Sequence, residues 1–429
     1  MKFKIGFLFL FLSLFLQPTF GQKAKKAQKP QVLVYGDDIL AFSIAVQSAK
    51  SNVPTLWLLK GEQLLPDFSR ERIHLETMPH MDGGVWMDIL MDMALTKVPE
   101  DSLAAVIKAD MNPRLFQNAV DKVLRDLPQL TVLRGEEVLA ITAKKKSWEV
   151  KGLSKHVYTV RTVVDASAEQ HLDALAGISW DKEAPKLSLL SDLSDAEART
   201  LVASGAIGTK QLYGYSLKGL LAGEKDGFLN MRGVSEMLDN NVVLTPFRAA
   251  VGQAIGAAAA YLAFFKTTAD RVDTRKLQSE LLSYGGRIVP FQDIDRKDPN
   301  FYALQRFVLA GVLPGLHTDE RCLFRKDKRV TFAEIEPVFD QLYTRSQLWF
   351  LDNKGNYFRW KDFVSLVEYV GLQGRNIEKQ IKEEGRSKLH FDGNFDPEAF
   401  VNRYQFAVIL DRYANAYVKT INQEGKFVF

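Results

Sequence analysis

The apolar positions between residues 31 and 59 fall into two short runs on either side of a helical segment. Residues 31–36 (QVLVYG) and 55–59 (TLWLL) are apolar runs of strand length. Residues 39–50 (ILAFSIAVQSAK) carry an alanine at every fourth position, which gives a helix a face that can approach a sheet closely. The pattern predicts a strand–helix–strand unit with parallel strands.

Strand and helix patterns alternate as far as residue 286, so we expect an α/β fold over residues 31–286. A helix with proline at its start is predicted over 113–127, and a buried helix rich in small residues over 247–265. Residues 178–240 are weakly patterned and are expected to be mostly loop. Strands are predicted within 130–135, 136–152 and 155–168, and a helical turn over 171–178.

The composition and the periodicity of the sequence change after residue 290. Residues 291–429 are rich in aromatic residues and mostly helical in pattern. Three segments in this part superimpose without gaps: 330–339, 358–367 and 401–410. Thr331 with Glu334, and Asn402 with Gln405, fit reciprocal capping at a helix start. Three independent amphipathic helices would give a similar pattern, so a repeat and a chance likeness both stay open.

The first 21 residues have the anatomy of a signal peptide, with two lysines, an apolar run over 5–16 and a small residue at position 21. The run is short for a membrane span, so a retained anchor is the weaker alternative. Residues 22–30 form a basic linker. We expect an exported protein, located in the periplasm or envelope or secreted, and no membrane span after cleavage, because no later stretch has the required length and apolarity.

Charge and cysteine usage add little. The formal net charge of +4 gives no reason to expect nucleic acid as a partner. Cys322 is the only cysteine, so no disulfide within the chain is possible. His74 and His80 stand six residues apart and match no metal-binding spacing, so no metal site is predicted.

Four stretches together resemble the FAD-dependent oxidoreductases whose fold is shared by the flavoprotein of succinate dehydrogenase. They are residues 32–62, 120–141, 163–178 and 251–285. The resemblance implies an FAD/NAD(P)-binding Rossmann-like domain with FAD as its cofactor. Residues 178–240 are short for the substrate cap of that family, which implies a reduced cap.

Residues 290–315 and the stretch Thr331–Glu334 resemble S-layer-homology repeats. The resemblance implies a small, mostly helical module over 291–429. Either binding of an envelope component or a packing role is compatible with it.

The resemblance also implies a set of cofactor-binding positions. Gly36 would make the tight turn after the first strand, and Ala41 would allow the helix to pack closely. Residues 252–256 (GQAIG) would present a helix N-terminus to the flavin. The full set is Gly36, Asp38, Ala41, Lys60, Val138, Ala166, Ser167, Ala168, Gly252 and Gln253.

Three of these positions depart from a working dinucleotide site. Asp38 stands where a glycine would let the pyrophosphate reach the backbone, and its carboxylate can cap the helix itself. Lys60 stands where an acid would hold the ribose. Ala168 adds a methyl group where glycine would allow close approach. The sequence therefore predicts an impaired FAD site.

Two classes of function stay open. One is a weakly active or non-catalytic binding or scaffold protein that keeps the fold. The other is an active FAD-dependent oxidoreductase that acts on a small molecule or glycan of the cell envelope. No acid or base can be named for such a reaction.

Overall fold

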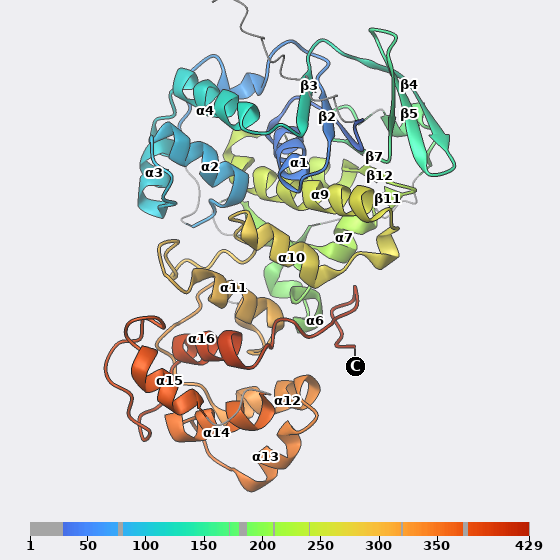
Figure 1. The fold of residues 1–429 in the computed structure, drawn as a ribbon. Coiled ribbons are helices and arrows are strands. Elements are labelled where there is room, and N and C mark those ends of the chain that lie inside the picture. The colour runs from blue at the N-terminus through green and yellow to red at the C-terminus, as the bar shows by residue number, and fades with distance from the viewer. Residues whose placement is uncertain are drawn as a thin grey trace, which may run out of the picture.

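The computed structural model describes residues 29–75, 80–170, 172–179, 187–208, 211–239, 241–318, 321–371 and 376–428. The expected signal peptide and all but the last two residues of the basic linker lie outside the described residues. Of the described chain, the part before residue 290 holds the sheets, and the part after it is built from helices (Figure 1).

A six-stranded sheet with the order β11–β12–β7–β1–β2–β3 forms the centre of the first part. Four of the five neighbouring pairs in this order run parallel, and only β11 is antiparallel to its neighbour β12. This confirms the α/β class and the predicted strand–helix–strand unit. The strands are β1 (Val32–Tyr35), β2 (Thr55–Leu58), β3 (Leu130–Leu133), β7 (Thr162–Asp165), β11 (Glu224–Lys225) and β12 (Phe228–Asn230).

The two faces of this sheet bury different partners, because side chains alternate along each strand. Val32 and Val34 of β1 belong to the core that contains the helices. Leu33 and Tyr35 belong to a separate apolar cluster with Trp148 and other residues of an antiparallel meander. The meander consists of β4 (Val138–Lys144), β5 (Ser147–Gly152) and β6 (Val157–Val160).

Helices cover the other face of the sheet, and α1 packs along the long helix α9 (Figure 1). The N-terminal part contains α1 (Ile39–Lys50), α2 (Gly84–Met93), α3 (Asp101–Ala109), α4 (Pro113–Arg125), α5 (Leu172–Leu175), α6 (Asp195–Ala198), α7 (Leu217–Leu221), α8 (Arg232–Met237), α9 (Thr245–Phe265) and α10 (Thr274–Ser283).

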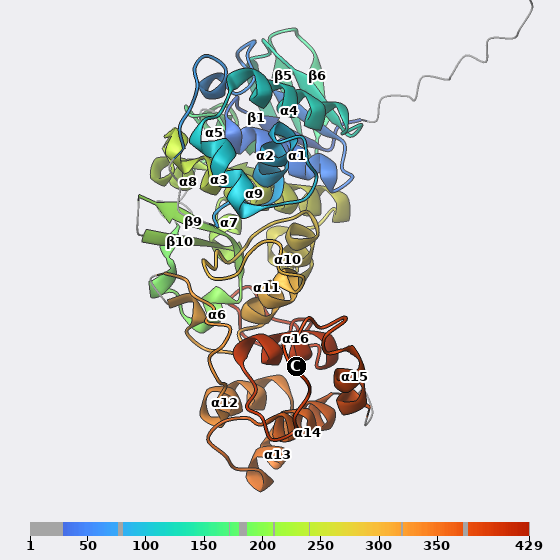
Figure 2. The same ribbon diagram turned by 90° about the vertical axis from the view of Figure 1, so that its left-hand side faces the viewer.

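The expectation of a mostly loop segment over 178–240 is wrong for the described residues of that range. They contain a three-stranded antiparallel sheet, β8 (Ser188–Leu189), β10 (Gln211–Ser216) and β9 (Leu201–Ile207), which lies beside α9 (Figure 2). Gly205 explains why the pattern was weak. A Cβ at this position would lie 2.3 Å from Cγ of Phe247, so the strand needs a glycine to pack against α9.

The predicted helix starts after residue 290 are confirmed. The helices that follow Thr331 and Asn402 begin with reciprocal caps. At Arg359 only one half of such a cap is present, because the carboxylate of Asp362 accepts a hydrogen bond from the backbone N–H of Arg359. The described helices of this part are α11 (Phe301–Ala310), α12 (Phe332–Leu342), α13 (Ser346–Asp352), α14 (Trp360–Val370), α15 (Ile377–Glu384) and α16 (Arg403–Tyr413).

The residues just before these three helix starts form a closed ring of backbone hydrogen bonds. The N–H of Val330 donates to the carbonyl of Val401, that of Phe358 to Val330, and that of Val401 to Phe358, over 3.3, 3.0 and 2.9 Å. Three equivalent positions therefore contact one another cyclically. This arrangement supports an internal repeat over a chance likeness.

The apolar core continues between the two parts of the chain. Buried residues on both sides of position 290 belong to one cluster, which includes Ile288, Val289 and Phe291. The side chain of Gln305 on α11 accepts hydrogen bonds from the N–H groups of Ile288 and Val289. The predicted boundary between residues 31–286 and 291–429 does not coincide with a break in packing. Whether the two parts fold independently stays a prediction.

One described helical stretch, Val242–Phe265, is long and apolar enough to cross a membrane by length and composition. The expectation that no later stretch meets this test is therefore wrong. In the structure, 83% of its most apolar window is buried within the protein. Its small residues pack against α1 and β9, as expected of a core helix.

Asp101 joins three segments at the start of α3. Its carboxylate accepts two hydrogen bonds from Arg287, at 2.9 and 3.1 Å, and one from the backbone N–H of Arg296. The ring of His80 lies 2.7 Å from the same carboxylate. Burial acts to raise the pKa of Asp101, but the hydrogen bond with His80 and the charge of Arg287 outweigh it and lower the pKa to about 2.

We predict that Asp101→Asn destabilises the protein by about 3 kcal/mol at pH 7, because Arg287 would keep a buried charge without its partner. The folded pKa lies below the unfolded value of about 3.9, so this stabilisation is present above pH ~4 and lost as the pH falls toward 2. Urea unfolding at pH 7 and pH 3 measures the difference. Asp110→Asn, which removes an exposed pair with Arg72, serves as the control with little effect. An equal loss at both pH values would contradict the assignment.

Candidate cofactor site

The candidate site lies where β1 and β7 end side by side, with β2 on the far side of β1. In open α/β sheets, ligands bind outside the carboxyl ends of the strands where the strand order reverses. The turn after β1 contains Gly36, whose φ of 145° favours glycine. A Cβ at Gly36 would lie 2.7 Å from the carbonyl oxygen of Ala166 and 3.0 Å from Cβ of Ala41. The predicted packing roles of Gly36 and Ala41 thus have a direct geometric basis.

Asp38 is the N-cap of α1. Its backbone is extended, and its carboxylate accepts a hydrogen bond of 2.8 Å from the N–H of Ala41. The same carboxylate forms an ion pair with Arg248 of α9. Both side chains are largely buried, with exposed fractions of 12% and 5%. Burial raises the pKa of Asp38, whereas Arg248 and the N–H of Ala41 act in the opposite direction.

The loop after β2 folds back over the start of α1. The N–H of Leu65 donates to the carbonyl of Asp37 over 3.2 Å, and the side chains of Leu64 and Leu65 are buried in the core. Lys60 lies at the exposed edge, 3.4 Å from Glu137 and 3.5 Å from Glu169. These two carboxylates raise the pKa of Lys60.

The turn after β7 is organised by Asp165. Its carboxylate accepts hydrogen bonds from the hydroxyl of Ser167 at 2.7 Å and from the N–H of Leu172 at 2.9 Å. The hydroxyl of Ser167 in turn accepts from the N–H of Gln170. Ser167 therefore has a structural task in this turn, and its hydroxyl is already engaged on both sides.

A cavity of about 220 Å³ remains between these turns. Asp38, Ala166, Ala168 and Arg248 are among the residues that line it. The structure thus brings three of the predicted positions together with one that was not predicted. Lys60, Val138, Gly252 and Gln253 do not line this cavity.

The expected helix start at residues 252–256 is wrong, because α9 begins at Thr245 and these residues lie inside it. A Cβ at Gly252 would lie 2.6 Å from the carbonyl oxygen of Leu40, so this glycine allows α9 to contact α1. The amide of Gln253 donates to Gln47 of α1 over 2.9 Å. Val138 is buried at the start of β4, in the cluster on the meander side of the sheet.

The two histidines considered for a metal site line one cavity but have different partners. His74 contacts the carbonyl of Ala109, whereas His80 is held by Asp101. Within the described residues, no group of three or more His, Cys, Asp or Glu side chains is placed to hold a metal ion.

Arg248 is the residue that sequence reasoning missed. It is the only charged residue between Thr245 and Phe265, in a helix whose other residues are almost all apolar or small. A buried guanidinium requires an anionic partner, and this requirement was the available signal. The identity of the partner could not be read from the sequence, because Asp38 lies 210 positions away.

Comparisons with known proteins concern the fold alone. No protein-family model matches the chain, and no curated protein matches it. Among solved structures, it is similar to bacillithiol disulfide reductase from Staphylococcus aureus, with 18% identity, a TM-score of 0.23, and coverage of 33% of this chain and 38% of the other. Tetracycline destructase Tet(51) has 16% identity, a TM-score of 0.25, and coverage of 39% and 45%.

A putative thioredoxin reductase from Bacillus anthracis gives 9% identity, a TM-score of 0.22, and coverage of 32% and 36%. The chain therefore spans less than half the length of the structures described here. Matches this partial and this weak carry no argument about chemistry, and the α/β assignment stands on the strand order of the chain itself.

We predict that Gly252→Ala and Gly256→Ala each destabilise the protein by about 1–3 kcal/mol through overpacking. The added Cβ atoms would lie 2.6 Å from the oxygen of Leu40 and 2.4 Å from that of Ile44. Where there is room for the added methyl group, replacing glycine with alanine inside a helix stabilises the helix by about 1 kcal/mol. The sign of the change in the free energy of unfolding therefore shows whether α1 and α9 are in close contact. Urea denaturation gives the measurement, and a stabilised variant would show that the α1–α9 contact is looser than described.

Proposed function

We propose that this protein is a weakly active or non-catalytic relative of the FAD-dependent oxidoreductases, and that it serves as an exported binding or scaffold protein. The observation that carries the proposal is the ion pair of Asp38 with Arg248 at the N-terminus of α1. In a dinucleotide-binding fold, that N-terminus receives the pyrophosphate. Here a carboxylate of the chain occupies the same position.

The residues present do not fit FAD in this arrangement. A pyrophosphate at the start of α1 would need the N–H groups that Asp38 caps and the space that its side chain fills. The cavity of about 220 Å³ is smaller than the roughly 300–1,000 Å³ of ordinary ligand pockets. The loop that carries Leu64 and Leu65 closes over the same turn.

Charge reinforces the effect of space. Two unit charges about 4 Å apart repel by about 4 kcal/mol at an effective dielectric constant near 20. This energy corresponds to roughly three decades of affinity. Arg248 would offset the repulsion only by leaving Asp38, and that would leave the carboxylate buried without its partner.

An active FAD-dependent oxidoreductase is the second candidate. The observation in its favour is again Arg248, a buried cation close to a helix N-terminus, where it could hold a phosphate if Asp38 rotated away. Its substrate would be a small molecule or glycan of the envelope. The two candidates differ in whether the unaltered protein binds FAD.

The module after residue 290 takes a packing role in this proposal. The backbone residues just before its three equivalent helices hydrogen-bond to one another. Arg306 of α11 also forms a bidentate ion pair with Asp411 of α16. Contacts of this kind fix the module internally. Attachment to an envelope component remains part of the proposal for the exported protein.

We predict that the unaltered protein binds FAD only weakly and that Asp38→Gly strengthens binding by between about ten- and a thousandfold, because it removes both the bulk and the charge. Adding Lys60→Glu should strengthen it further by restoring an acceptor for the ribose. Titration with FAD at fixed salt, followed by flavin fluorescence, measures the three affinities.

Two controls make this titration decisive. Asp38→Asn keeps a helix cap and removes the charge, so it separates repulsion from bulk. Arg248→Met in the Asp38→Gly background should abolish the gain, because the phosphates would lose their buried cation. Circular dichroism confirms folding of each variant. Submicromolar binding by the unaltered protein would refute the impaired site and favour the active oxidoreductase.

Export gives a separate prediction. The mature protein should lack residues 1–21, because the leader has the charge and apolar length that signal peptidase substrates share. Expression in a bacterial host, followed by fractionation and intact-mass measurement, tests this. A mass that retains the leader on a membrane-bound protein would favour the anchor instead.

A further inference from the structure

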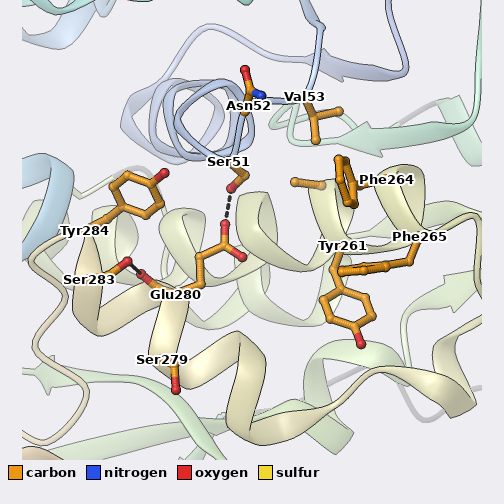
Figure 3. A pocket seen from close by; sticks show the side chains of 11 residues that line it. Ser51, Asn52, Val53, Tyr261, Phe264, Phe265, Ser279, Glu280, Ser283 and Tyr284 are labelled. Atoms are coloured by element: carbon orange, nitrogen blue, oxygen red, sulfur yellow. Dashed lines mark hydrogen bonds between the residues drawn. The ribbon is translucent and has the colours of Figure 1, made fainter.

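A second cavity, of about 480 Å³, lies at the opposite end of α1 from Asp38. It opens between the C-terminal ends of α1 and α9 and one side of α10 (Figure 3). One wall carries the aromatic side chains of Tyr261, Phe264 and Phe265. The facing wall carries Glu280, with Ser51 above it (Figure 3).

The aromatic wall is unusually open to solvent. Phe264 and Phe265 have exposed fractions of 58% and 54%, whereas Tyr261 is buried. The rings contact one another, with centroids 4.5 Å apart for Tyr261 and Phe265 and 5.0 Å apart for Phe264 and Phe265. Aromatic faces that line a cavity attract cations through the negative potential of their π-systems.

The facing wall supplies a carboxylate that lacks a cation. Glu280 accepts a hydrogen bond from the hydroxyl of Ser51, and none of the described residues forms an ion pair with it. Burial raises the pKa of Glu280, and its hydrogen bonds with Ser51 and Gln47 partly oppose this change. A carboxylate that is held and partly desolvated in this way gains most from an incoming positive charge.

The surrounding backbone favours the same sign of charge. Arg248 meets Asp38, Gly252 contacts Leu40, and Gly256 contacts Ile44, so α1 and α9 run in the same direction. Their C-terminal ends, which carry partial negative charge, therefore both lie at this cavity. The nearby ammonium group of Lys50 is engaged by Asp88.

We propose that this cavity binds the alkylammonium group of a small organic cation, with Glu280 as counter-ion and Tyr261, Phe264 and Phe265 as the aromatic wall. The volume lies within the range of ordinary ligand pockets and exceeds the need of a trimethylammonium group. The site shares none of its lining residues with the cavity beside Asp38, so this proposal stands without the one for FAD.

Choline is the probe, and its neutral isostere 3,3-dimethyl-1-butanol is the matched control ligand. Isothermal titration calorimetry of the protein should give saturable binding of choline and at least about tenfold weaker binding of the isostere. Glu280→Gln should weaken choline binding by about tenfold or more. Glu383→Gln, an exposed acid of α15, should leave it unchanged.

The aromatic wall has its own test. Phe264→Ala with Phe265→Ala should weaken choline binding several-fold, and because both rings are exposed the melting temperature should change little. If the double alanine variant lost both choline binding and its fold, the result would be ambiguous. The double variant Phe264→Leu with Phe265→Leu then separates the two effects, because leucine keeps the apolar bulk but has no π-face. Retained choline affinity in that variant would overturn the aromatic assignment.

The pH dependence provides a readout that packing alone would not give. Choline affinity should fall as the pH is lowered through the pKa of Glu280, and Glu280→Gln should flatten the profile. The other titratable side chains that line the cavity are those of Tyr261 and Tyr284, and the ammonium group of Lys50 lies over the Tyr284 ring. Burial raises the pKa of Tyr284 further above the acidic range.

A second experiment asks whether the ammonium group belongs to a free small molecule or to a lipid headgroup. Sedimentation with phosphatidylcholine vesicles, with and without Glu280→Gln, asks whether the same site takes a lipid headgroup. Binding that depends on Glu280 in either arm supports the proposal and names the source. Absence of such binding in both arms, or equal binding of the neutral isostere, would overturn it.

Discussion

The contact between α1 and α9 determines most of what the N-terminal part can do. The two helices approach closely because Gly252 and Gly256 present bare backbone to the carbonyl groups of Leu40 and Ile44. No side chain larger than hydrogen fits at either position without displacement. Since the contact fixes the rotation of α9, it also sets Arg248 against the start of α1. The ion pair with Asp38 is therefore a consequence of backbone packing.

Because α1 and α9 run in the same direction, their dipoles point the same way. The two ends of this helix pair therefore carry opposite partial charges. The N-terminus of α1, with Arg248 beside it, favours an anion, and in this chain the anion is Asp38. The C-terminal ends favour a cation, and there Glu280 adds a formal negative charge. One end is satisfied within the chain, whereas the other has a carboxylate without a paired cation among the described residues. This asymmetry separates a structural ion pair from a site that can still take a ligand.

Local patterns were enough to predict most of the elements but not the pairs between them. The reciprocal cap of Thr331 with Glu334 was readable because both partners lie within one helical turn. The strands β9 and β10 were missed because a glycine interrupts the alternation of side chains in each of them. Gly205 of β9 makes room for Phe247, and Gly214 of β10 makes room for Leu201. Gly252 was assigned to a helix start for a related reason. Small residues in a sequence mark close approach, and the sequence does not say whether the approaching group is a cofactor or another helix.

The pair of Asp38 and Arg248 also bears on how the fold depends on a ligand. A buried guanidinium without an anion would cost the folded state about 3–5 kcal/mol, a large fraction of the stability of an ordinary domain. If a pyrophosphate supplied that anion, stability would rise and fall with the cofactor concentration. With Asp38 in place, the charge is balanced within the chain and α1 begins with its cap already made. In the proposed function, the carboxylate that would hinder a dinucleotide also frees the fold from needing one.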